Sequence, residues 1–271
     1  MINEFEFVFG LLNIKGFGKK KVLDYIESHC FNLEMCILYL DFIFDESQKK
    51  VFEFNLLKAQ EIEKECENKK IKILSLFDDK FPKRLLKGKD PCILIYYFGN
   101  IGLISEKSIA VIGTRNPSQY FLDKSNSIIK KIVENDYVIV SGLALGCDAH
   151  GHSKCLEFGG KTIAVLPSSI DNIQPRQNIE IARNIAKSGS LLISEYPPKS
   201  EYNKFNYPER DRIQSLLSDK VLVIQASENS GTMICVRKSL QDAKPVYALK
   251  NNNLSLIDIE IDDNNIELLF K

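Results

Sequence analysis

The sequence predicts an α/β fold in which a doubly wound, mostly parallel sheet follows a small N-terminal helical domain. The first observation is a series of short apolar runs, rich in β-branched residues, that begin 25 to 30 residues apart. This interval holds a strand, a crossover helix and two short loops, so it is typical of successive βαβ units. The runs are Ser108–Ile112, Tyr137–Val140, Thr162–Leu166, Leu191–Ser194, Val221–Gln225 and Val246–Leu249.

The second observation is the character of these runs and of the segments between them. The runs are apolar almost throughout, as expected for parallel strands that are covered on both faces. The intervening segments have helical spacing, for example at Ile128, Ile129 and Ile132. Two earlier runs, Ile71–Leu76 and Cys92–Phe98, flank a short helical segment and are predicted to extend the same sheet.

The third observation is a change of composition near residue 65, which predicts three parts. Residues 1–65 are charged, have helical spacing and lack the strand periodicity, so they are predicted to form a helical domain. Residues 66–250 are predicted to form the sheet domain. In residues 251–271, Ile257, Ile259 and Ile261 alternate with acidic residues. This acidic tail is either a last edge strand or a loosely held segment.

The overall charge limits how the chain can attract an acidic partner. It has 36 Lys and Arg residues and 36 Asp and Glu residues, so its net charge is zero. Any nucleic-acid binding therefore needs a local cluster of cations. The N-terminus lacks the cationic stretch of a signal peptide, and no apolar run is long enough to span a bilayer. With seven scattered cysteines, these features predict a reduced, cytoplasmic protein.

Three strand-to-helix turns carry the least ordinary residues. In a parallel sheet, ligands bind beyond the carboxyl ends of the strands, where glycine lets the backbone approach a ligand and helix amides receive an anion. Three such turns on one edge predict a composite phosphate site, although each glycine alone has a purely geometric explanation. The turns are Gly113-Thr114-Arg115, Ser141-Gly142 with the following Gly146, and Ser230-Gly231-Thr232.

The sequence lacks the motifs of two common kinds of nucleotide-binding site. Gly113 is not followed by the second and third glycines of a dinucleotide-binding turn, which disfavours NAD and FAD. The chain has no G-x-x-x-x-G-K-[ST] motif, which disfavours ATP hydrolysis. We therefore expect no cofactor.

Arg210 and Arg212 precede the strand at Val221 and, with Arg115, are predicted to supply the local positive charge. The alternative is an exposed salt-bridge network with Glu209 and Asp211. Further candidates at the same edge are Lys161, Arg176 and Asn178.

Several motifs, in order, resemble the DprA/Smf family. They are Phe81-Pro-Lys-Arg-Leu-Leu86, Ile109-Ala-Val-Ile-Gly-Thr-Arg115, Val140-Ser-Gly-Leu-Ala-Leu-Gly-Cys-Asp148 with His152, Gly159-Gly-Lys-Thr-Ile-Ala-Val-Leu166, Leu192-Ile-Ser-Glu-Tyr-Pro-Pro198 and Pro208-Glu-Arg-Asp-Arg-Ile213. The resemblance implies an extended Rossmann-like fold that binds and protects single-stranded DNA and forms a homodimer. It also implies a protein that is not an enzyme and that loads a RecA-type recombinase in transformation or recombination.

The same resemblance implies which residues hold phosphate. Arg115, Lys161 and Arg210 would neutralise its charge, and the small residues would offer amides and hydroxyl groups. The complete expected set is Gly113, Thr114, Arg115, Ser141, Gly142, Gly146, Lys161, Asn178, Arg210, Arg212, Ser230, Gly231 and Thr232.

The chain departs from the family pattern at several positions. Leu145 stands where the family usually has arginine, Asp211 replaces the usual asparagine, and Leu216 replaces a usual glycine. The usual Pro-Gly pair is missing after Leu249, and we expect no winged-helix domain of the kind that many members carry. These departures put the strength of DNA binding and the identity of the partner in doubt.

Near the N-terminus, Gly16-Phe17-Gly18 followed by Lys19 resembles the turn of a helix-hairpin-helix motif. In such a turn the glycine amides contact a backbone phosphate. The alternative is that the glycines only allow the two helices to pack.

A cluster of Cys147, His150, His152 and Cys155 resembles a set of metal ligands. At a helical period the two histidines point about 200° apart and cannot join one tetrahedral site. The cysteines are eight residues apart and share a face, so we predict that they are core residues and that no metal is bound.

The competing function is a nucleotide-hydrolysing enzyme that resembles the phosphoribohydrolases. Those enzymes carry Pro-Gly-Gly-x-Gly-Thr-x-x-Glu, whereas here Cys235 stands at the position of the glutamate and Glu228 precedes the turn. Hydrolysis is therefore disfavoured. A third alternative is a module that senses a free nucleotide in the same pocket.

Overall fold

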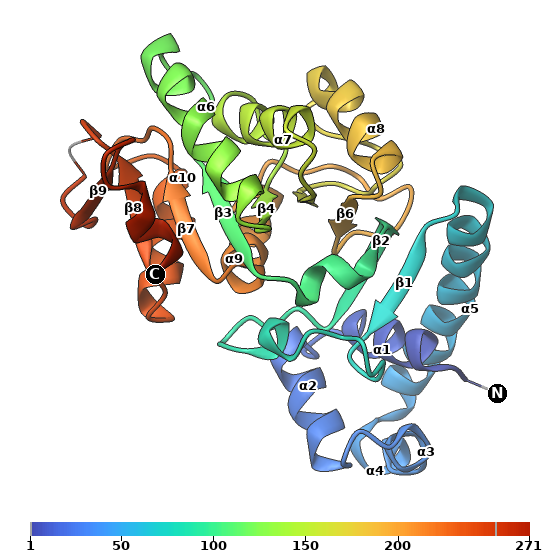
Figure 1. The fold of residues 1–271 in the computed structure, drawn as a ribbon. Coiled ribbons are helices and arrows are strands. Elements are labelled where there is room, and N and C mark those ends of the chain that lie inside the picture. The colour runs from blue at the N-terminus through green and yellow to red at the C-terminus, as the bar shows by residue number, and fades with distance from the viewer. Residues whose placement is uncertain (1, 253) are drawn as a thin grey trace. The chain divides into compact units, whose positions relative to one another are not determined.

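In this computed structural model, residues 2–252 and 254–271 are described. The chain divides into two units, one up to Tyr97 and the other from Phe98. Figure 1 labels the helices and strands of both units. Among the described residues, no helix is long and apolar enough to cross a membrane.

The first unit begins with helices whose ends follow from local sequence. Asn3 caps helix α1 (Glu4–Leu12) and Asp45 caps helix α5 (Glu46–Lys69), each in a reciprocal capping box with the residue three positions later. Helix α5 ends at Lys70, which adopts a left-handed backbone conformation. Three further helices lie between them: α2 (Lys19–Ser28), α3 (Leu33–Leu38) and α4 (Leu40–Ile43).

An antiparallel pair of strands follows these helices. Strand β1 (Lys72–Ser75) pairs with β2 (Leu94–Gly99), and a short 3-10 helix (Lys83–Leu86) lies between them in the chain. Strand β1 also packs on α1 and α5. The first unit therefore continues past residue 65 to Tyr97, while the division of the chain into three domains at residues 65 and 250 stays a prediction.

The second unit contains a parallel sheet in which all seven strands run in the same direction. Their order is β6-β5-β4-β3-β7-β8-β9. Each of the six runs predicted from residue 108 onward overlaps one strand of this sheet, so the prediction of an α/β, mostly parallel fold is confirmed. The strands are β3 (Ser108–Ile112), β4 (Val138–Ser141), β5 (Thr162–Leu166), β6 (Leu191–Ser194), β7 (Lys220–Val223), β8 (Val246–Leu249) and β9 (Ile259–Ile261).

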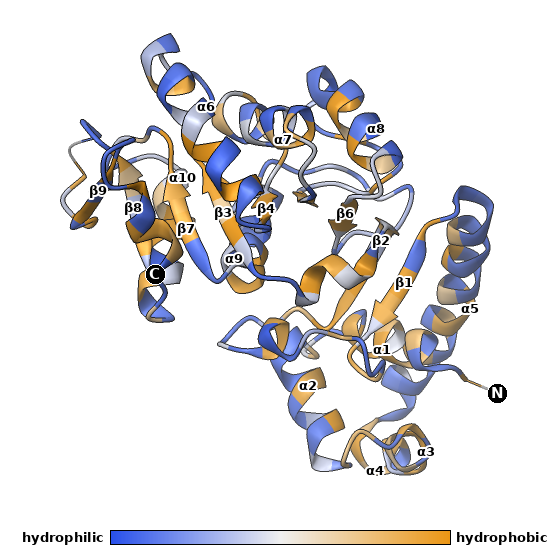
Figure 2. Ribbon diagram, viewed as in Figure 1, coloured by the Kyte–Doolittle hydropathy of each residue, from blue (hydrophilic) through white to orange (hydrophobic). Residues whose placement is uncertain are grey.

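Helices cover both faces of this sheet because successive side chains of each strand point to opposite faces. Ile109 and Val111 of β3 join the core beneath helices α6 (Gln119–Glu134) and α7 (Cys147–Glu157). Ala110 and Ile112 join a second core beneath α10 (Thr232–Gln241). Figure 2 shows β3 as hydrophobic along most of its length. The remaining helices are α8 (Ile179–Lys187), α9 (Asn206–Leu217) and three 3-10 helices at Ile101–Ser105, Arg176–Asn178 and Ile266–Phe270.

The C-terminal residues form an edge strand, which is the first of the two alternatives raised by the sequence. Strand β9 pairs in parallel with β8 through Tyr247↔Ile259 and Leu249↔Ile261. The 3-10 helix after it places Leu269 in the core beneath α6. Ile257 and Ile261 of this segment therefore pack in the core, whereas Ile259 of the edge strand is 40% exposed.

Lys244 fixes the end of α9, the helix that carries Arg210. Its ammonium group donates hydrogen bonds to the backbone carbonyl groups of Ser215, Leu216 at 3.3 Å and Ser218 at 2.6 Å. These carbonyl groups lie at the helix C-terminus, where backbone acceptors lack partners within the helix and a cation is favoured. The segment before β8 therefore holds α9 in place.

Replacing Lys244 with methionine should keep most of the side-chain volume and remove the donor. Because half-buried carbonyl groups would lose a charged donor, we expect the free energy of unfolding to fall by about 1–3 kcal/mol. Urea titration measures this change. Lys238→Met is the control, since Lys238 makes a surface pair with Asp242 and should change stability by less than about 0.5 kcal/mol. Equal losses in the two variants would contradict this role of Lys244.

Candidate functional site

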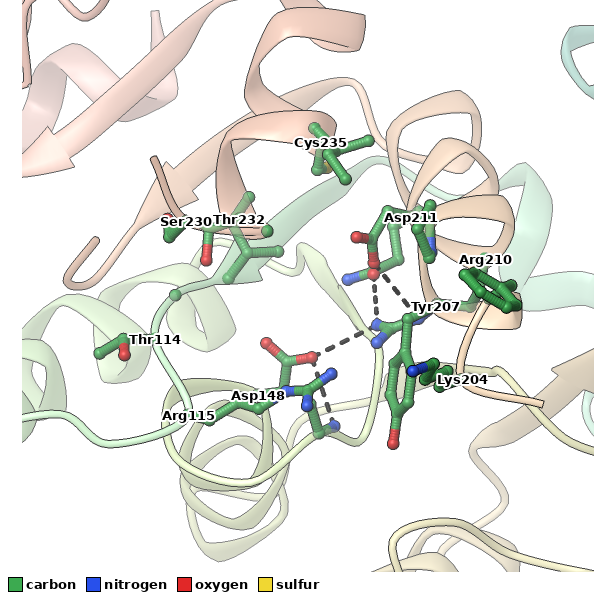
Figure 3. Close-up of a pocket in the computed structure, with 18 of the residues that line it drawn as sticks. Thr114, Arg115, Asp148, Lys204, Tyr207, Arg210, Asp211, Ser230, Thr232 and Cys235 are labelled. Carbon is green, nitrogen blue, oxygen red and sulfur yellow. Dashed lines mark hydrogen bonds and ion pairs between the residues drawn. The ribbon is translucent and has the colours of Figure 1, made fainter. Parts of the chain in front are cut away.

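The loops after β3, β4 and β7 converge on a pocket of about 630 Å³ at the carboxyl ends of the strands (Figure 3). Thr114 joins two of the loops to its own, because its amide donates to the Gln225 carbonyl at 2.7 Å and its carbonyl accepts from the Cys147 amide at 3.1 Å. This is the edge at which ligands bind in parallel sheets. The lining residues are Ile112, Gly113, Thr114, Arg115, Ala144, Asp148, Tyr202, Lys204, Phe205, Tyr207, Pro208, Arg210, Asp211, Gln214, Ser230, Gly231, Thr232, Ile234 and Cys235.

Two glycines allow these loops to pack backbone against backbone. A Cβ atom on Gly113 would lie 2.5 Å from the Cys147 sulfur and 2.8 Å from the Gln225 carbonyl oxygen. Gly146 has a φ of 76°, and its Cβ atom would lie 2.4 Å from the Thr114 carbonyl oxygen. Both glycines are therefore required by the close approach of neighbouring loops.

Gly142 leaves room for the side chain of Arg210. A Cβ atom on Gly142 would lie 0.9 Å from Arg210 Nη1. Beside it, Asp148 Oδ2 accepts hydrogen bonds from the amides of Gly142 at 3.2 Å and Ala144 at 3.3 Å. The same oxygen lies 3.4 Å from Arg210 Nη1. Asp148 thus joins the loop after β4 to helix α9.

Arg210 is buried and neutralised by its neighbours. Only 4% of it is exposed, and it pairs with Asp148 and, through Nε at 3.3 Å, with Asp211. Gln214 Oε1 also accepts a hydrogen bond from its guanidinium group. Burial raises the pKa of the Asp211 carboxyl to about 6, although Arg210 acts in the opposite direction. Arg210 therefore holds Asp148 and Asp211 together, and these three side chains form the floor of the pocket.

Arg115 is the exposed arginine of the pocket. Its guanidinium group lies over the ring of Tyr207, 4.3 Å from the ring centroid. The same ring is 5.7 Å from the guanidinium carbon of Arg210, so Tyr207 lies near both cations (Figure 3). Stacking on an aromatic face orients a guanidinium fork without using its donors. Arg115 can therefore present those donors to an anion.

Three aromatic residues close together in the sequence line the pocket and form its aromatic rim: Tyr202, Phe205 and Tyr207. Tyr202 packs edge-on against Tyr207 with ring centroids 6.0 Å apart, and Phe205 is 70% exposed beside Lys204. These aromatic residues were not among the site residues predicted from the sequence. The signal was an aromatic residue at 202, 205 and 207 in the segment leading into α9.

The third predicted turn opens helix α10. Gly231 caps this helix without a side-chain hydrogen bond, and Ser230 and Thr232 line the pocket on either side of it. The amide groups at a helix N-terminus attract an anion. This turn therefore provides, in the pocket that Arg115 also lines, a second group suited to phosphate.

Seven predicted residues line the pocket, and the other predicted residues of the sheet domain do not. Ser141 donates to the Val111 carbonyl at 2.6 Å, and Asn178 donates to the carbonyl groups of Leu143 and Ala144, so both position loops. The pocket residues from the prediction are Gly113, Thr114, Arg115, Arg210, Ser230, Gly231 and Thr232.

Two predicted cations lie elsewhere. Lys161 immediately precedes β5, at the amino-terminal edge of the parallel sheet, where its ammonium donates to the Ser188 carbonyl. Arg212 is 8% exposed and pairs with Glu195. The exposed salt-bridge network with Glu209 and Asp211, which the sequence left open, does not form: Arg210 does pair with Asp211, but both arginines are buried.

The N-terminal glycines lie in a hairpin between α1 and α2. Gly16 has a φ of 88° and Gly18 caps α2, with open space beside both. Lys19 pairs with Asp90 at 3.7 Å, and the Lys21 ammonium lies 4.0 Å from the centroid of the Phe17 ring. This arrangement fits a helix-hairpin-helix, and its contact with DNA stays a prediction.

The cysteines of the suspected metal cluster are core residues, as predicted. Cys147 and Cys155 belong to α7 and are fully buried in the core that this helix shares with α6 and the sheet. His152 Nδ1 is 2.7 Å from Thr162 Oγ1, and burial lowers the pKa of this histidine to about 3. Among the described residues, no group of three or more His, Cys, Asp or Glu side chains could hold a metal.

The acid that the phosphoribohydrolase alternative needs is not at its expected position. Cys235 lies there instead, and burial raises the pKa of its thiol. Glu228 accepts a hydrogen bond from the Ser255 amide at the surface. The hydrolase alternative is therefore not favoured.

Comparison with known proteins decides the family. The model of the DNA recombination-mediator protein A family matches residues 72–257. The chain belongs to this family. The resemblance to DprA/Smf proteins is thus confirmed, including the extended Rossmann-like fold.

Curated relatives include DNA processing protein DprA of Bacillus subtilis, 34% identical over 66% of this chain and 60% of the relative. Protein Smf of Synechocystis is 33% identical over 76% of this chain and 52% of the relative. The chain thus spans half to two thirds of the length of these relatives.

Two solved structures of DprA proteins are similar to the structure of this chain. The X-ray structure of DprA from Streptococcus pneumoniae has a TM-score of 0.77 and 28% identity, and the match covers 100% of this chain and 93% of that one. DprA from Helicobacter pylori, whose structure was described for its single-stranded DNA binding mode, has a TM-score of 0.61 and 31% identity. That match covers 74% of this chain and 87% of the relative.

Replacing Gly142 with alanine should push Arg210 out of its position, because the added methyl group would overlap the guanidinium. We expect the free energy of unfolding to fall by about 1–3 kcal/mol, as in other overpacked sites. Urea unfolding of Gly142→Ala measures it. The control is Gly231→Ala in the same pocket, where a Cβ atom meets open space. A loss in the control as large as that in Gly142→Ala would refute the proposed contact.

Proposed function

We propose that this chain binds single-stranded DNA, with a backbone phosphate in the pocket and bases over the aromatic rim. The observation that carries this proposal is the exposed guanidinium of Arg115, oriented by Tyr207 in a pocket that the N-terminus of α10 also lines. A guanidinium fork and helix amides are both favoured ligands of phosphate. The relative from Helicobacter pylori supports the choice of ligand.

The rim supports a single strand over a duplex. Tyr202 and Phe205 are 38% and 70% exposed, respectively, and both line the pocket. Unpaired bases stack on aromatic rings, whereas bases within a duplex are already stacked on each other. Because such stacking uses a face that every base has, we expect little base preference.

The proposed role is that of a binding module rather than an enzyme. The carboxylates of the pocket, Asp148 and Asp211, are both ion-paired with Arg210. Such pairing suits them to position loops and to set the charge of the site.

We further propose that the chain forms a homodimer, protects single-stranded DNA and passes it to a RecA-type recombinase. This step is supported by the description of the family as recombination mediators. It is independent of the pocket chemistry, since a protein can hold a strand without a recombinase.

Charge reversal at Arg115 should remove strand binding without unfolding the protein. In a titration with fluorescent oligo-dT, we expect Arg115→Glu to lose at least about 100-fold in affinity, because a charged hydrogen bond is replaced by repulsion. Arg183→Glu is the control, since Arg183 lies on the surface of α8 in a pair with Glu180. Unchanged affinity of Arg115→Glu would count against the pocket.

The same titration separates a strand from a free nucleotide. Strand binding predicts that affinity rises with oligonucleotide length and falls steeply with salt, because several phosphates release counterions. Saturation by a mononucleotide with a shallow salt dependence would favour the nucleotide-sensing alternative.

Removing the ring of Phe205 should weaken strand binding. Loss of one base-stacking contact costs about 1–3 kcal/mol, so we expect Phe205→Ala to bind oligo-dT correspondingly less tightly. Affinity for duplex DNA should change much less. Phe42→Ala is the control, because Phe42 is 80% exposed on α4. Equal effects on single strands and duplexes would refute the stacking role.

A further inference from the structure

Two buried carboxylates share one guanidinium at the pocket floor. Arg210 pairs with Asp148 at 3.4 Å and with Asp211 at 3.3 Å. When both acids are ionised, these three side chains carry one net negative charge. Asp211 also lines the pocket. The floor of the proposed phosphate site is therefore acidic at high pH.

An entering phosphodiester carries a negative charge that it cannot lose near neutral pH. Its approach to the pocket floor would therefore place like charges in a poorly solvated site, where repulsion is strong. A proton on Asp211 removes this repulsion and leaves Arg210 balanced by Asp148 alone.

We propose that Asp211 takes up a proton when a backbone phosphate enters the pocket, so that the chain binds DNA and a proton together. This inference rests on the proposed function. Asp211 is then a positioning residue. Its protonation state sets the charge of the pocket floor, and this charge affects how tightly the strand is bound.

The surroundings of Asp211 favour such a proton. The carboxyl is largely buried, and burial raises its pKa to about 6 before any ligand arrives. A neighbouring phosphate raises the pKa further, because it disfavours the ionised form. The titratable and charged groups around it are Arg210 and Tyr207 of its own helix, Asp148 of α7, Arg115 after β3, Lys204 before α9 and Cys235 of α10.

Nearby histidines do not supply the same pH dependence. Burial lowers the pKa of both His150 and His152, and His152 remains neutral because its pKa is about 3. In the pocket itself, burial raises the pKa of the Asp211 carboxyl to about 6, within the pH range of interest.

The direction of the effect follows from the raised pKa. Below about pH 6 Asp211 is already protonated, so strand binding takes up few further protons and the affinity for the strand is high. Above about pH 6 the free carboxyl is ionised, and each bound strand must take up a proton. Affinity then falls by up to about tenfold per pH unit until the pKa of the bound state is reached.

The experiment is a titration of the full chain with oligo-dT between about pH 5.5 and pH 8.5 at fixed ionic strength, combined with calorimetry. Calorimetry at about pH 7.5 in HEPES and in Tris, whose ionisation enthalpies differ, counts the protons taken up. We compare Asp211→Asn with Asp258→Asn, which removes one exposed carboxylate of the C-terminal segment.

The wild type and Asp258→Asn should take up a proton and lose affinity as pH rises. Asp211→Asn should take up none, show a flat profile and bind about tenfold more tightly than the wild type near pH 8. Strand binding by the wild type without proton uptake would overturn this inference alone, even if the asparagine variant failed to fold. No strand binding at any pH would overturn the proposed function as well.

Discussion

The buried ion pair between Arg210 and Asp148 is the interaction on which the site depends. It joins α9 to α7 and to the loop after β4, since Asp148 also accepts from the amides of Gly142 and Ala144. An unpaired charge at this depth would be strongly unfavourable, so each partner requires the other. Gly142 provides the space for this pair, and Tyr207 connects it to the exposed Arg115. The pocket is thus built around a cation that is paired with two carboxylates.

The architecture was largely predictable, because parallel strands covered on both faces leave a strong sequence signal. The apolar run at 108–112 and its successors became β3 to β8, and glycines after β3 and β4 marked the loops. The acidic tail was ambiguous because alternating isoleucines suit both an edge strand and an exposed segment. Only its pairing with β8 distinguishes them.

The charge balance of the site was less predictable, because it depends on partners far apart in the sequence. Arg210, Arg212 and Lys161 all looked like cations for phosphate. In the fold, Arg210 pairs with Asp148, which is 62 residues away in the sequence, and Arg212 pairs with Glu195. Lys161 lies at the opposite edge of the sheet from the pocket. The aromatic rim was missed because aromatic residues in a loop are usually read as packing. The exposure of these rings is set by the fold and leaves no signal in the sequence.

The order of the pocket's parts along the chain has a consequence for synthesis. Gly113 and Thr232 lie on facing loops of one pocket but are more than a hundred residues apart. A ribosome adds residues at about 5–20 per second, so about 6 to 24 seconds separate the synthesis of the first part from that of the last. The proposed phosphate site cannot be assembled until α10 has emerged from the ribosome. Any binding of a strand in this site therefore has to follow the synthesis of α10.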